Sequence, residues 1–220
     1  MDFLASNCVM ENLSFPDQVF KSLLFAPGNK RSILSKLPRS SPDASIIYLE
    51  DTVPTDEKTN ARETARATIP ELNEKNKKMG LFVRVNAFET KHFAEDLSIA
   101  ISDELTGITV PKISSKEEAD QISKSLSDFG FVNLPIMAGL ETVSGLVNAL
   151  EIAKHPRVKW CYFGAEDYVA DLGGVRRVDN RAVLLARSQI SQAARIGGIH
   201  AIDMVAVSYT HLTLPTNREV

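Results

Sequence analysis

Short apolar segments recur along the chain and alternate with longer segments in which apolar residues follow a helical period. Several of the short segments are continuously apolar rather than alternating, which is typical of parallel strands buried on both faces. They end in polar residues, Gly or Pro. They predict seven strands, at residues 22–26, 44–49, 81–86, 107–111, 134–140, 157–163 and 200–206.

Helices are predicted between these strands, at residues 55–72, 115–127, 142–154 and 179–196. We expect Thr55 to cap the first helix, and Ser115 to form a capping box with Glu118 at the second. The last helix is expected to start at Asp179 and to end at Gly197-Gly198.

The alternation of strand and helix predicts an α/β fold with a parallel sheet. Seven such strands favour a (β/α)₈ TIM barrel, and no GxGxxG motif follows a strand, which disfavours a dinucleotide-binding sheet. A complete barrel needs eight strands, so we expect a barrel that is incomplete at the C-terminus. Residues 1–21 are predicted as an N-terminal extension, 22–207 as the barrel domain and 208–220 as a tail of non-native appearance.

Composition narrows the classes of partner. The chain has 220 residues, of which 44% are hydrophobic and 24% charged, as in globular proteins. Lys and Arg total 25 and Asp and Glu 28, so the basic excess typical of a protein that binds nucleic acid is missing. Two cysteines without a CxxC pair, no apolar run of spanning length and no basic leader predict a reduced, cytoplasmic protein without a membrane partner. The mitochondrial matrix stays open as an alternative.

In a parallel barrel the active site lies at the carboxyl ends of the strands. The polar residues expected there are Gly28, Asn29, Glu50, Asp51, Arg84, Asn86, Lys112, Glu141, Glu166, Asp167 and Asp203. Glu141 and Asp167 follow neighbouring strands, and two carboxylates that face one space are commonly balanced by a hard divalent cation. Mg²⁺ leaves positions for a chelating substrate, and Arg84 can clamp a carboxylate through two hydrogen bonds. The pattern predicts a site for a small 2-oxo or 2-hydroxy acid on Mg²⁺.

Structural alternatives exist for these residues. Glu141 and Asp167 could instead cap the helices that follow them. Arg84 could form an ion pair with Glu50 or Asp51, because an Arg within an apolar strand needs a partner. Glu50 and Asp51 could support the waters of the metal or simply pair with a nearby cation.

Other polar residues have simpler interpretations. Lys58 and Arg62 lie at i, i+4 on one helix, and we favour a solvated face over a contact with a CoA phosphate. Lys112 is interpreted as a salt-bridge partner rather than a Schiff-base lysine. Pro27-Gly28-Asn29 is interpreted as the first turn after a strand, with a contact to ligand as the alternative.

Six separated motifs carry a resemblance to a known family: LLFAPGNK (23–30), YLEDTVPTDEKTNAR (48–62), VRVNA (83–87), GITVPKISS (107–115), GLETVSGLVNA (139–149) and FGAEDYVADLGG (163–174). In this order they resemble the citrate lyase β-subunit-like proteins, which belong with malyl-CoA lyase and the HpcH/HpaI aldolases. The resemblance runs from about residue 22 to 206. The segment AIDMVAV (201–207) is most similar to citramalyl-CoA lyase-like members.

The resemblance implies a modified (β/α)₈ barrel, a homotrimer or larger homo-oligomer, and Mg²⁺-dependent, reversible Claisen-type cleavage of a hydroxyacyl-CoA. It implies Glu141 and Asp167 as metal ligands, Arg84 as a substrate-binding residue, and Glu50 and Asp51 at the rim. The family continues into a C-terminal segment with an acidic residue, and nothing after Val207 matches it.

We therefore predict a lyase that cleaves a citramalyl-CoA or malyl-CoA type thioester to a 2-oxo acid and acetyl-CoA. Arg84, Glu50 and Asp51 are its predicted catalytic residues, and Gly28 and Asn29 join Arg84 in binding substrate. The alternatives are a citrate lyase β subunit that acts on citryl-acyl-carrier-protein, a thioester hydrolase, and a non-catalytic barrel that binds CoA or a protein partner.

Overall fold

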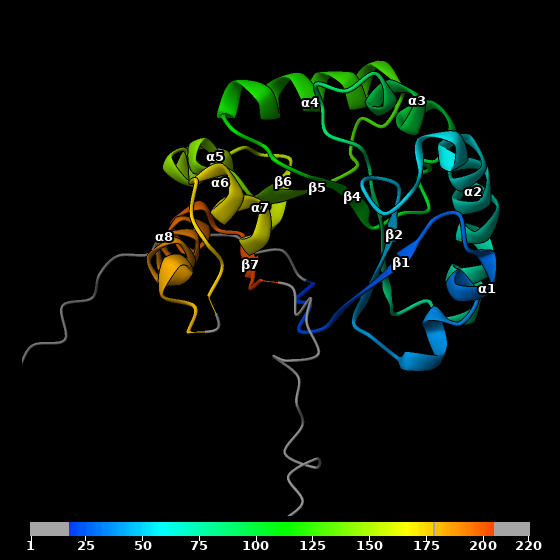
Figure 1. Ribbon diagram of the computed structural model, residues 1–220. Helices are drawn as coiled ribbons and strands as arrows, with labels where there is room; N and C mark the ends of the chain where they lie inside the picture. Colours follow the sequence, from blue (N-terminus) through cyan, green and yellow to red (C-terminus); the bar gives the residue numbers. More distant parts are fainter. Residues whose placement is uncertain (1–17, 178, 205–220) are drawn as a thin grey trace, which may run out of the picture.

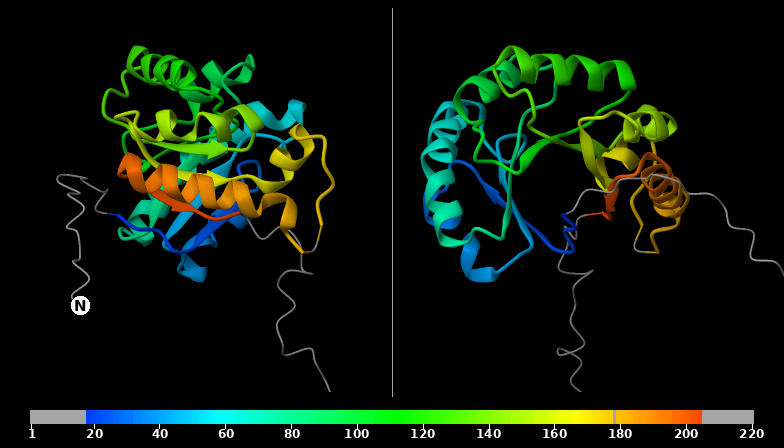
Figure 2. Two further views of the ribbon diagram at one scale, coloured as in Figure 1. Left: turned by 90° about the vertical axis from the view of Figure 1, so that its left-hand side faces the viewer. Right: turned by 180° about the vertical axis from the view of Figure 1, so that it is seen from behind.

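The computed structural model describes residues 18–177 and 179–204, and its centre is one parallel sheet of seven strands in the order β1 to β7. The sheet curls into an incomplete barrel with β1 and β7 at its two edges, and the helices lie along its convex side (Figures 1 and 2). The strands are β1 Leu23–Pro27, β2 Ala44–Tyr48, β3 Gly80–Arg84, β4 Gly107–Val110, β5 Ile136–Leu140, β6 Val158–Phe163 and β7 His200–Ile202.

The predicted strands are therefore confirmed, with ends that shift by a few residues; residues 205 and 206 of the last one lie outside the described part. The fold class is confirmed as well. The predicted tail, 208–220, also lies outside the described residues. Within the described residues, no helix combines the length and the apolar character that crossing a bilayer requires.

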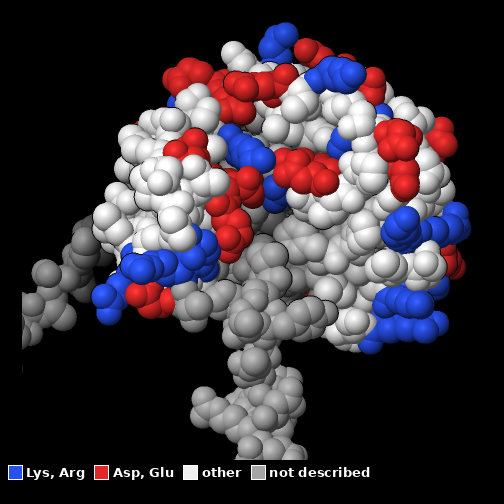
Figure 3. All heavy atoms as spheres, in the orientation of Figure 1, with Lys and Arg blue, Asp and Glu red and all other residues white. Residues whose placement is uncertain are grey.

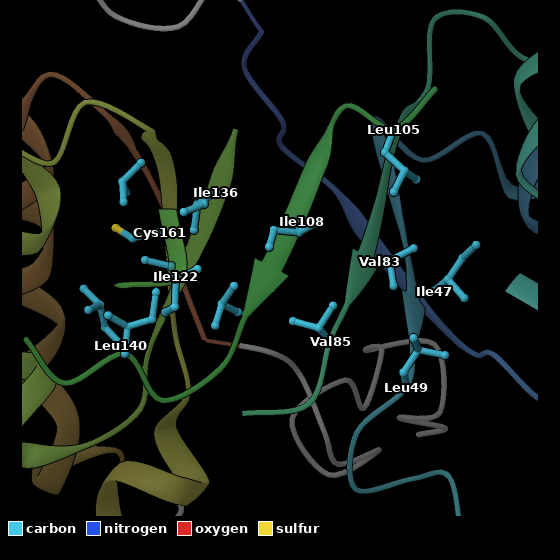
Figure 4. Close-up of a cluster of buried hydrophobic side chains, with 14 of the residues drawn as sticks. Ile47, Leu49, Val83, Val85, Leu105, Ile108, Ile122, Ile136, Leu140 and Cys161 are labelled. Carbon is cyan, nitrogen blue, oxygen red and sulfur yellow. The ribbon is translucent and has the colours of Figure 1, made fainter. Parts of the chain in front are cut away.

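The outer face of the sheet packs on the helices. Side chains alternate along each strand, so Ile47 of β2 and Val83 of β3 point outward and are fully buried in the main core. Ile108 and Cys161 continue this layer across the sheet, as Figure 4 shows. Burial of each such aliphatic side chain contributes about 1.5–3 kcal/mol, which makes this layer the main source of stability.

The inner face forms a second, smaller core at the amino ends of the strands. Phe82 and Trp160 meet edge to face with ring centroids 5.3 Å apart, and Phe20 packs 5.5 Å from each of them. The indole Nε1 of Trp160 donates to the carbonyl of Gln18 at 3.1 Å. Residues 18–20, within the predicted extension 1–21, thus help to fill the barrel from below.

The helices are α1 Arg31–Leu34, α2 Lys58–Lys75, α3 His92–Ile99, α4 Lys116–Asp128, α5 Val143–Val147, α6 Ala149–Ala153, α7 Ala165–Asp171 and α8 Arg181–Gly197. All four predicted helices are present, although the third is divided into α5 and α6. Helices α3 and α7 were not predicted as separate elements, because segments of seven or eight residues carry few periodic positions.

Two of the predicted capping interactions differ in the structure. Thr55 opens a 3₁₀ turn, Thr55–Glu57, ahead of α2 and does not cap that helix, so its predicted role is wrong. Ser115 does cap α4 by accepting from the Glu118 N–H, but the Glu118 carboxylate accepts from Ser114 rather than from Ser115. A strongly amphipathic helix is recognisable locally, whereas the direction of a capping carboxylate depends on the loop before it.

Candidate active site

Arg84 ends β3 and lies at the centre of the polar cluster at the carboxyl ends of the strands. Its Nε donates to Glu50 Oε2 at 2.7 Å, and its terminal nitrogens contact Glu141 Oε1 at 2.9 Å and Oε2 at 3.3 Å. The residue is only 5% exposed, so an unpaired charge here would be costly. The hypothesis that Arg84 pairs with Glu50 is confirmed, and its second carboxylate partner is Glu141.

Two tyrosines complete the surroundings of this guanidinium. Tyr48 is the register partner of Arg84 in the sheet, and its ring centroid lies 5.1 Å from the guanidinium carbon. The Tyr162 ring lies 5.4 Å from the same carbon, and its hydroxyl accepts from Arg84 and donates to Glu141. Aromatic faces on a buried cation stabilise its charge and limit its orientations. Arg84 is therefore held from four directions.

Glu141 follows β5, and its place depends on two glycines. A Cβ at Gly164 would lie 2.4 Å from Glu141 Cγ, and a Cβ at Gly139 would lie 2.4 Å from the Tyr162 hydroxyl. Thr142, not Glu141, caps the next helix by accepting from the Gly145 N–H. The alternative that Glu141 is a helix cap is therefore wrong, and its carboxylate is directed into the cluster.

Lys112 forms the second centre of charge. Its Nζ lies 3.3 Å from Asp167 Oδ1, 3.6 Å from Glu50 Oε1 and 3.7 Å from Asp51 Oδ2. The interpretation of Lys112 as a salt-bridge partner is confirmed. Its backbone has φ of 56°, in the left-handed region that non-glycine residues rarely adopt. This strained turn directs a cation to the rim between three carboxylates, which is a common property of functional sites.

Asp167 lies in the first turn of α7, whose preceding residue is Gly164. Its side chain caps no backbone group of that helix and pairs with Lys112. Its neighbour Glu166, which is also expected at the carboxyl ends of the strands, is exposed and pairs with Arg176 at 3.1 Å. Acids in a first helical turn are favoured by the helix dipole, which adds to the pull of Lys112 on the Asp167 carboxylate.

Burial and charge oppose each other in this cluster. Burial works against the charge of Arg84, but the Tyr162 oxygen and the carboxylates of Glu141 and Glu50 outweigh it and raise the pKa of Arg84. Burial raises the pKa of Glu50, and Arg84 counteracts part of that rise. Burial also opposes the charge of Lys112, yet the neighbouring carboxylates raise its pKa overall. Both cations therefore stay charged at neutral pH.

The cluster opens into a cavity of about 660 Å³ at the rim of the barrel. Arg84, Glu141, Asp167 and Asn29 are among the residues that line it. Figure 3, drawn from the same side as Figure 1, shows acidic and basic side chains next to one another near the centre of this face. The structure thus brings the three main predicted residues to one space. Glu50, Asp51 and Lys112 do not line it. Glu50 contacts Arg84, which does, and Asp51 pairs with Lys112.

The segment Pro27-Gly28-Asn29 forms the turn that was predicted. The Gly28 N–H donates to the Tyr48 carbonyl at 2.8 Å, and Lys30 N–H donates to the Pro27 carbonyl at 3.2 Å. The Asn29 amide donates to Glu57, while its buried Oδ1 has no hydrogen-bond partner within the described residues. A buried acceptor without a partner is uncommon in folded proteins, and Asn29 is one of the residues at the cavity wall.

The donor set is compatible with a hard divalent ion. Four carboxylates (Glu50, Asp51, Glu141 and Asp167) meet two cations (Arg84 and Lys112), which leaves two negative charges. Over residues 18–177 and 179–204, no three His, Cys, Asp or Glu side chains are grouped as a preformed metal centre. A site with two protein carboxylates fits Mg²⁺, which keeps several waters, and does not fit a structural metal.

Comparison with known proteins shows the family of this chain. The chain matches the HpcH/HpaI aldolase/citrate lyase family over residues 21–213 and belongs to it. The citrate lyase subunit beta-like protein of Deinococcus radiodurans is 44% identical over 198 residues, which are 89% of this chain and 69% of that protein. The (3S)-malyl-CoA thioesterase of Cereibacter sphaeroides is 32% identical, over 84% of this chain and 63% of its own length.

Two solved structures of similar fold contain magnesium together with an oxo acid. Mycobacterium tuberculosis CitE in complex with magnesium, acetoacetate and coenzyme A has a TM-score of 0.74 and 29% identity, covering 88% of this chain and 68% of that one. The citrate lyase beta subunit of the same organism, with oxaloacetate and magnesium, has a TM-score of 0.71 and 31% identity, covering 86% and 79%. This chain thus spans about two thirds to four fifths of these proteins.

Sequence reasoning missed both tyrosines and the central position of Lys112. Tyr162 lies two residues after the inward Trp160 on β6 and shares its face, so its inward direction could have been predicted from the strand period. The ion pairs of Lys112 depend on the left-handed backbone of that residue, which no local sequence pattern predicts.

Proposed function

We propose that the chain is a Mg²⁺-dependent carbon–carbon lyase that cleaves a short hydroxyacyl-CoA thioester of the citramalyl-CoA or malyl-CoA type. In this reaction the substrate hydroxyl loses a proton and becomes the carbonyl of a 2-oxo acid. The bonding electrons pass to the thioester α-carbon, which takes up a proton to give acetyl-CoA. The observation that carries the proposal is the convergence of Arg84, Glu141 and Asp167 on one cavity at the carboxyl ends of the strands.

Glu141 and Asp167 would hold the magnesium ion, as two carboxylates of neighbouring βα units that line the same space. When bound, the ion supplies a Lewis acid that polarises a substrate oxygen. In the structure, Glu141 pairs with Arg84 and Asp167 pairs with Lys112. A bound ion would therefore share these two carboxylates with the two cations. The magnesium complexes of the two Mycobacterium structures support this assignment.

Arg84 would bind the acid part of the substrate. Its guanidinium is planar, stays charged and is fixed by Glu50 and by the faces of Tyr48 and Tyr162. A cation that needs no reorientation stabilises developing charge on oxygen at low cost. Glu50 does not line the cavity, so in this proposal it orients Arg84, while Asp51 shares Lys112.

The test separates metal binding from turnover. Asp167→Asn and Glu141→Gln should each weaken Mg²⁺ binding in calorimetry. Each should also lower the rate of acetyl-CoA release from malyl-CoA and citramalyl-CoA by about 10-fold to 100-fold. Asp128→Asn is the matched control, because Asp128 forms an exposed pair with Lys124 on α4. Unchanged Mg²⁺ affinity and unchanged turnover in Asp167→Asn would contradict the assignment of Asp167 as a magnesium ligand.

The same assay distinguishes the alternatives. Free CoA in place of acetyl-CoA would indicate a thioesterase, the activity named for the Cereibacter relative. Cleavage of citryl-acyl-carrier-protein alone would indicate a citrate lyase β subunit, the name of a 28% identical relative in Leuconostoc mesenteroides. Ligand binding without any turnover would indicate a non-catalytic barrel. We include a homotrimer or larger homo-oligomer in the proposal, and sedimentation equilibrium tests it.

A further inference from the structure

A second polar network lies behind the active site, between α2 and the ends of two strands. Lys58 is only 8% exposed, and its Nζ donates to the carbonyls of Leu49 at 2.8 Å and Glu50 at 3.1 Å and to Asn86 Oδ1 at 2.7 Å. An ammonium has three donors, and here each has an acceptor. The expectation of a solvated face for Lys58 is therefore wrong.

The network continues through buried side chains to α3. The Asn86 amide donates to the Leu49 carbonyl at 3.2 Å and to Asp96 Oδ2 at 2.7 Å. The other oxygen of Asp96 accepts from Arg62 Nε at 2.7 Å, and Arg62 is 2% exposed, so its predicted solvated position is wrong as well. Two helices thus hold the carboxyl ends of β2 and β3 together through side chains.

This network does not touch the cavity, but it ends on Glu50, which contacts the cavity-lining Arg84. Lys58 is absent from the cavity wall, yet it binds the main-chain oxygen of Glu50. The Glu50 carboxylate in turn accepts from Arg84 and lies 3.6 Å from Lys112. Any shift of the backbone at residues 49–50 therefore changes the support of both cations.

We propose that Lys58 is a positioning residue for the active site: with Asn86 it fixes the backbone at Glu50 and so sets the orientation of Arg84. The expected effect of Lys58 on kcat rests on the proposed function, whereas its effect on the orientation of Arg84 does not. A buried charge is a poor way to gain stability alone, because an apolar side chain of the same length avoids the cost of desolvation. The three directed hydrogen bonds define a geometry that an apolar side chain cannot.

The first measurement needs no activity. NMR of the folded protein should show a slowly exchanging Arg84 Nε–H, identified by its loss in Arg84→Lys, because that proton is bound to Glu50. In Lys58→Met we expect this exchange to accelerate by about 10-fold or more. Lys75→Met, on the same helix in an exposed pair with Glu71, is the matched control and should leave the exchange unchanged.

The second measurement is kinetic. Lys58→Met should lower kcat by roughly 10-fold to 100-fold with little change in KM for the CoA ester, as expected when an orienting partner is lost. Lys58→Arg keeps a charged donor and should recover part of kcat; it also serves as the test variant if Lys58→Met does not fold. Wild-type Arg84 exchange in a folded Lys58→Met protein would overturn the proposal, as would equal effects in Lys75→Met. If the wild type has no lyase activity, the exchange measurement still decides the positioning role.

Discussion

Gly164 and Glu141 are in such close contact that no side chain fits between them: a Cβ at residue 164 would lie 2.4 Å from Glu141 Cγ and 2.9 Å from Oε1. The glycine belongs to the turn between β6 and α7, and the glutamate follows β5. The packing of these two residues thus joins the segment that carries Asp167 to the other proposed magnesium ligand.

Gly164→Ala should consequently displace the Glu141 carboxylate. We expect weaker Mg²⁺ binding in calorimetry and a loss of about 1–3 kcal/mol in the free energy of unfolding, the usual cost of overpacking. Gly174→Ala is the control, because a Cβ there would meet its nearest neighbour, Val169, at an ordinary 3.4 Å. Equal Mg²⁺ affinities in the wild type and Gly164→Ala would contradict the prediction.

Arg84→Met should be strongly destabilising even without ligand. It removes the charge that faces the buried carboxylates of Glu50 and Glu141, and breaking a buried pair typically costs about 3–5 kcal/mol. Urea unfolding measures this loss. Arg31→Met removes an exposed pair with Glu71 and should cost about 0–1 kcal/mol. Similar values for the two variants would show that Arg84 is not the central partner described above.

Asp43 should make stability depend on pH in the acidic range. Its carboxylate accepts hydrogen bonds from the Lys21 N–H, the Ser22 hydroxyl and the Ser22 N–H, which hold its pKa below the ordinary 3.8. A lowered pKa means that the contribution is complete above about pH 4 and is lost as pH falls through the folded-state value. The difference in unfolding midpoint between wild type and Asp43→Asn should therefore shrink below about pH 4. A constant difference would contradict this.

Cys161 should not react while the protein is folded. Its thiol is buried in the layer between sheet and helices, and burial raises its pKa to about 12, so almost no thiolate exists at neutral pH. The only other cysteine of the chain is Cys8, so a Cys8→Ser variant leaves Cys161 as the single thiol. Labelling of this variant by a thiol reagent should follow the rate of global unfolding. Rapid labelling of that variant under native conditions would show that this layer opens locally.

The local pattern predicts the order of the seven strands and of the four longer helical segments. Continuous apolar segments such as ASIIYL at 44–49 and the capped amphipathic helix that begins after Ser115 each carry their own periodicity. Parallel strands bring their carboxyl ends to one rim, so Arg84, Glu141 and Asp167 were expected together and line one cavity. Their roles in binding metal and substrate stay predictions.

What only the tertiary structure decided is which charges meet. Lys58 and Arg62 are charged residues at i, i+4 of α2, which in the sequence alone indicates a solvated face. In the fold they face inward, and their buried partners Asn86 and Asp96 belong to other segments that local periodicity cannot show. The same holds for Arg84, whose carboxylate partners are 34 residues before and 57 residues after it in the chain. Apolar periodicity is a local property of the chain, whereas the pairing of buried charges is a property of the space that the folded strands enclose.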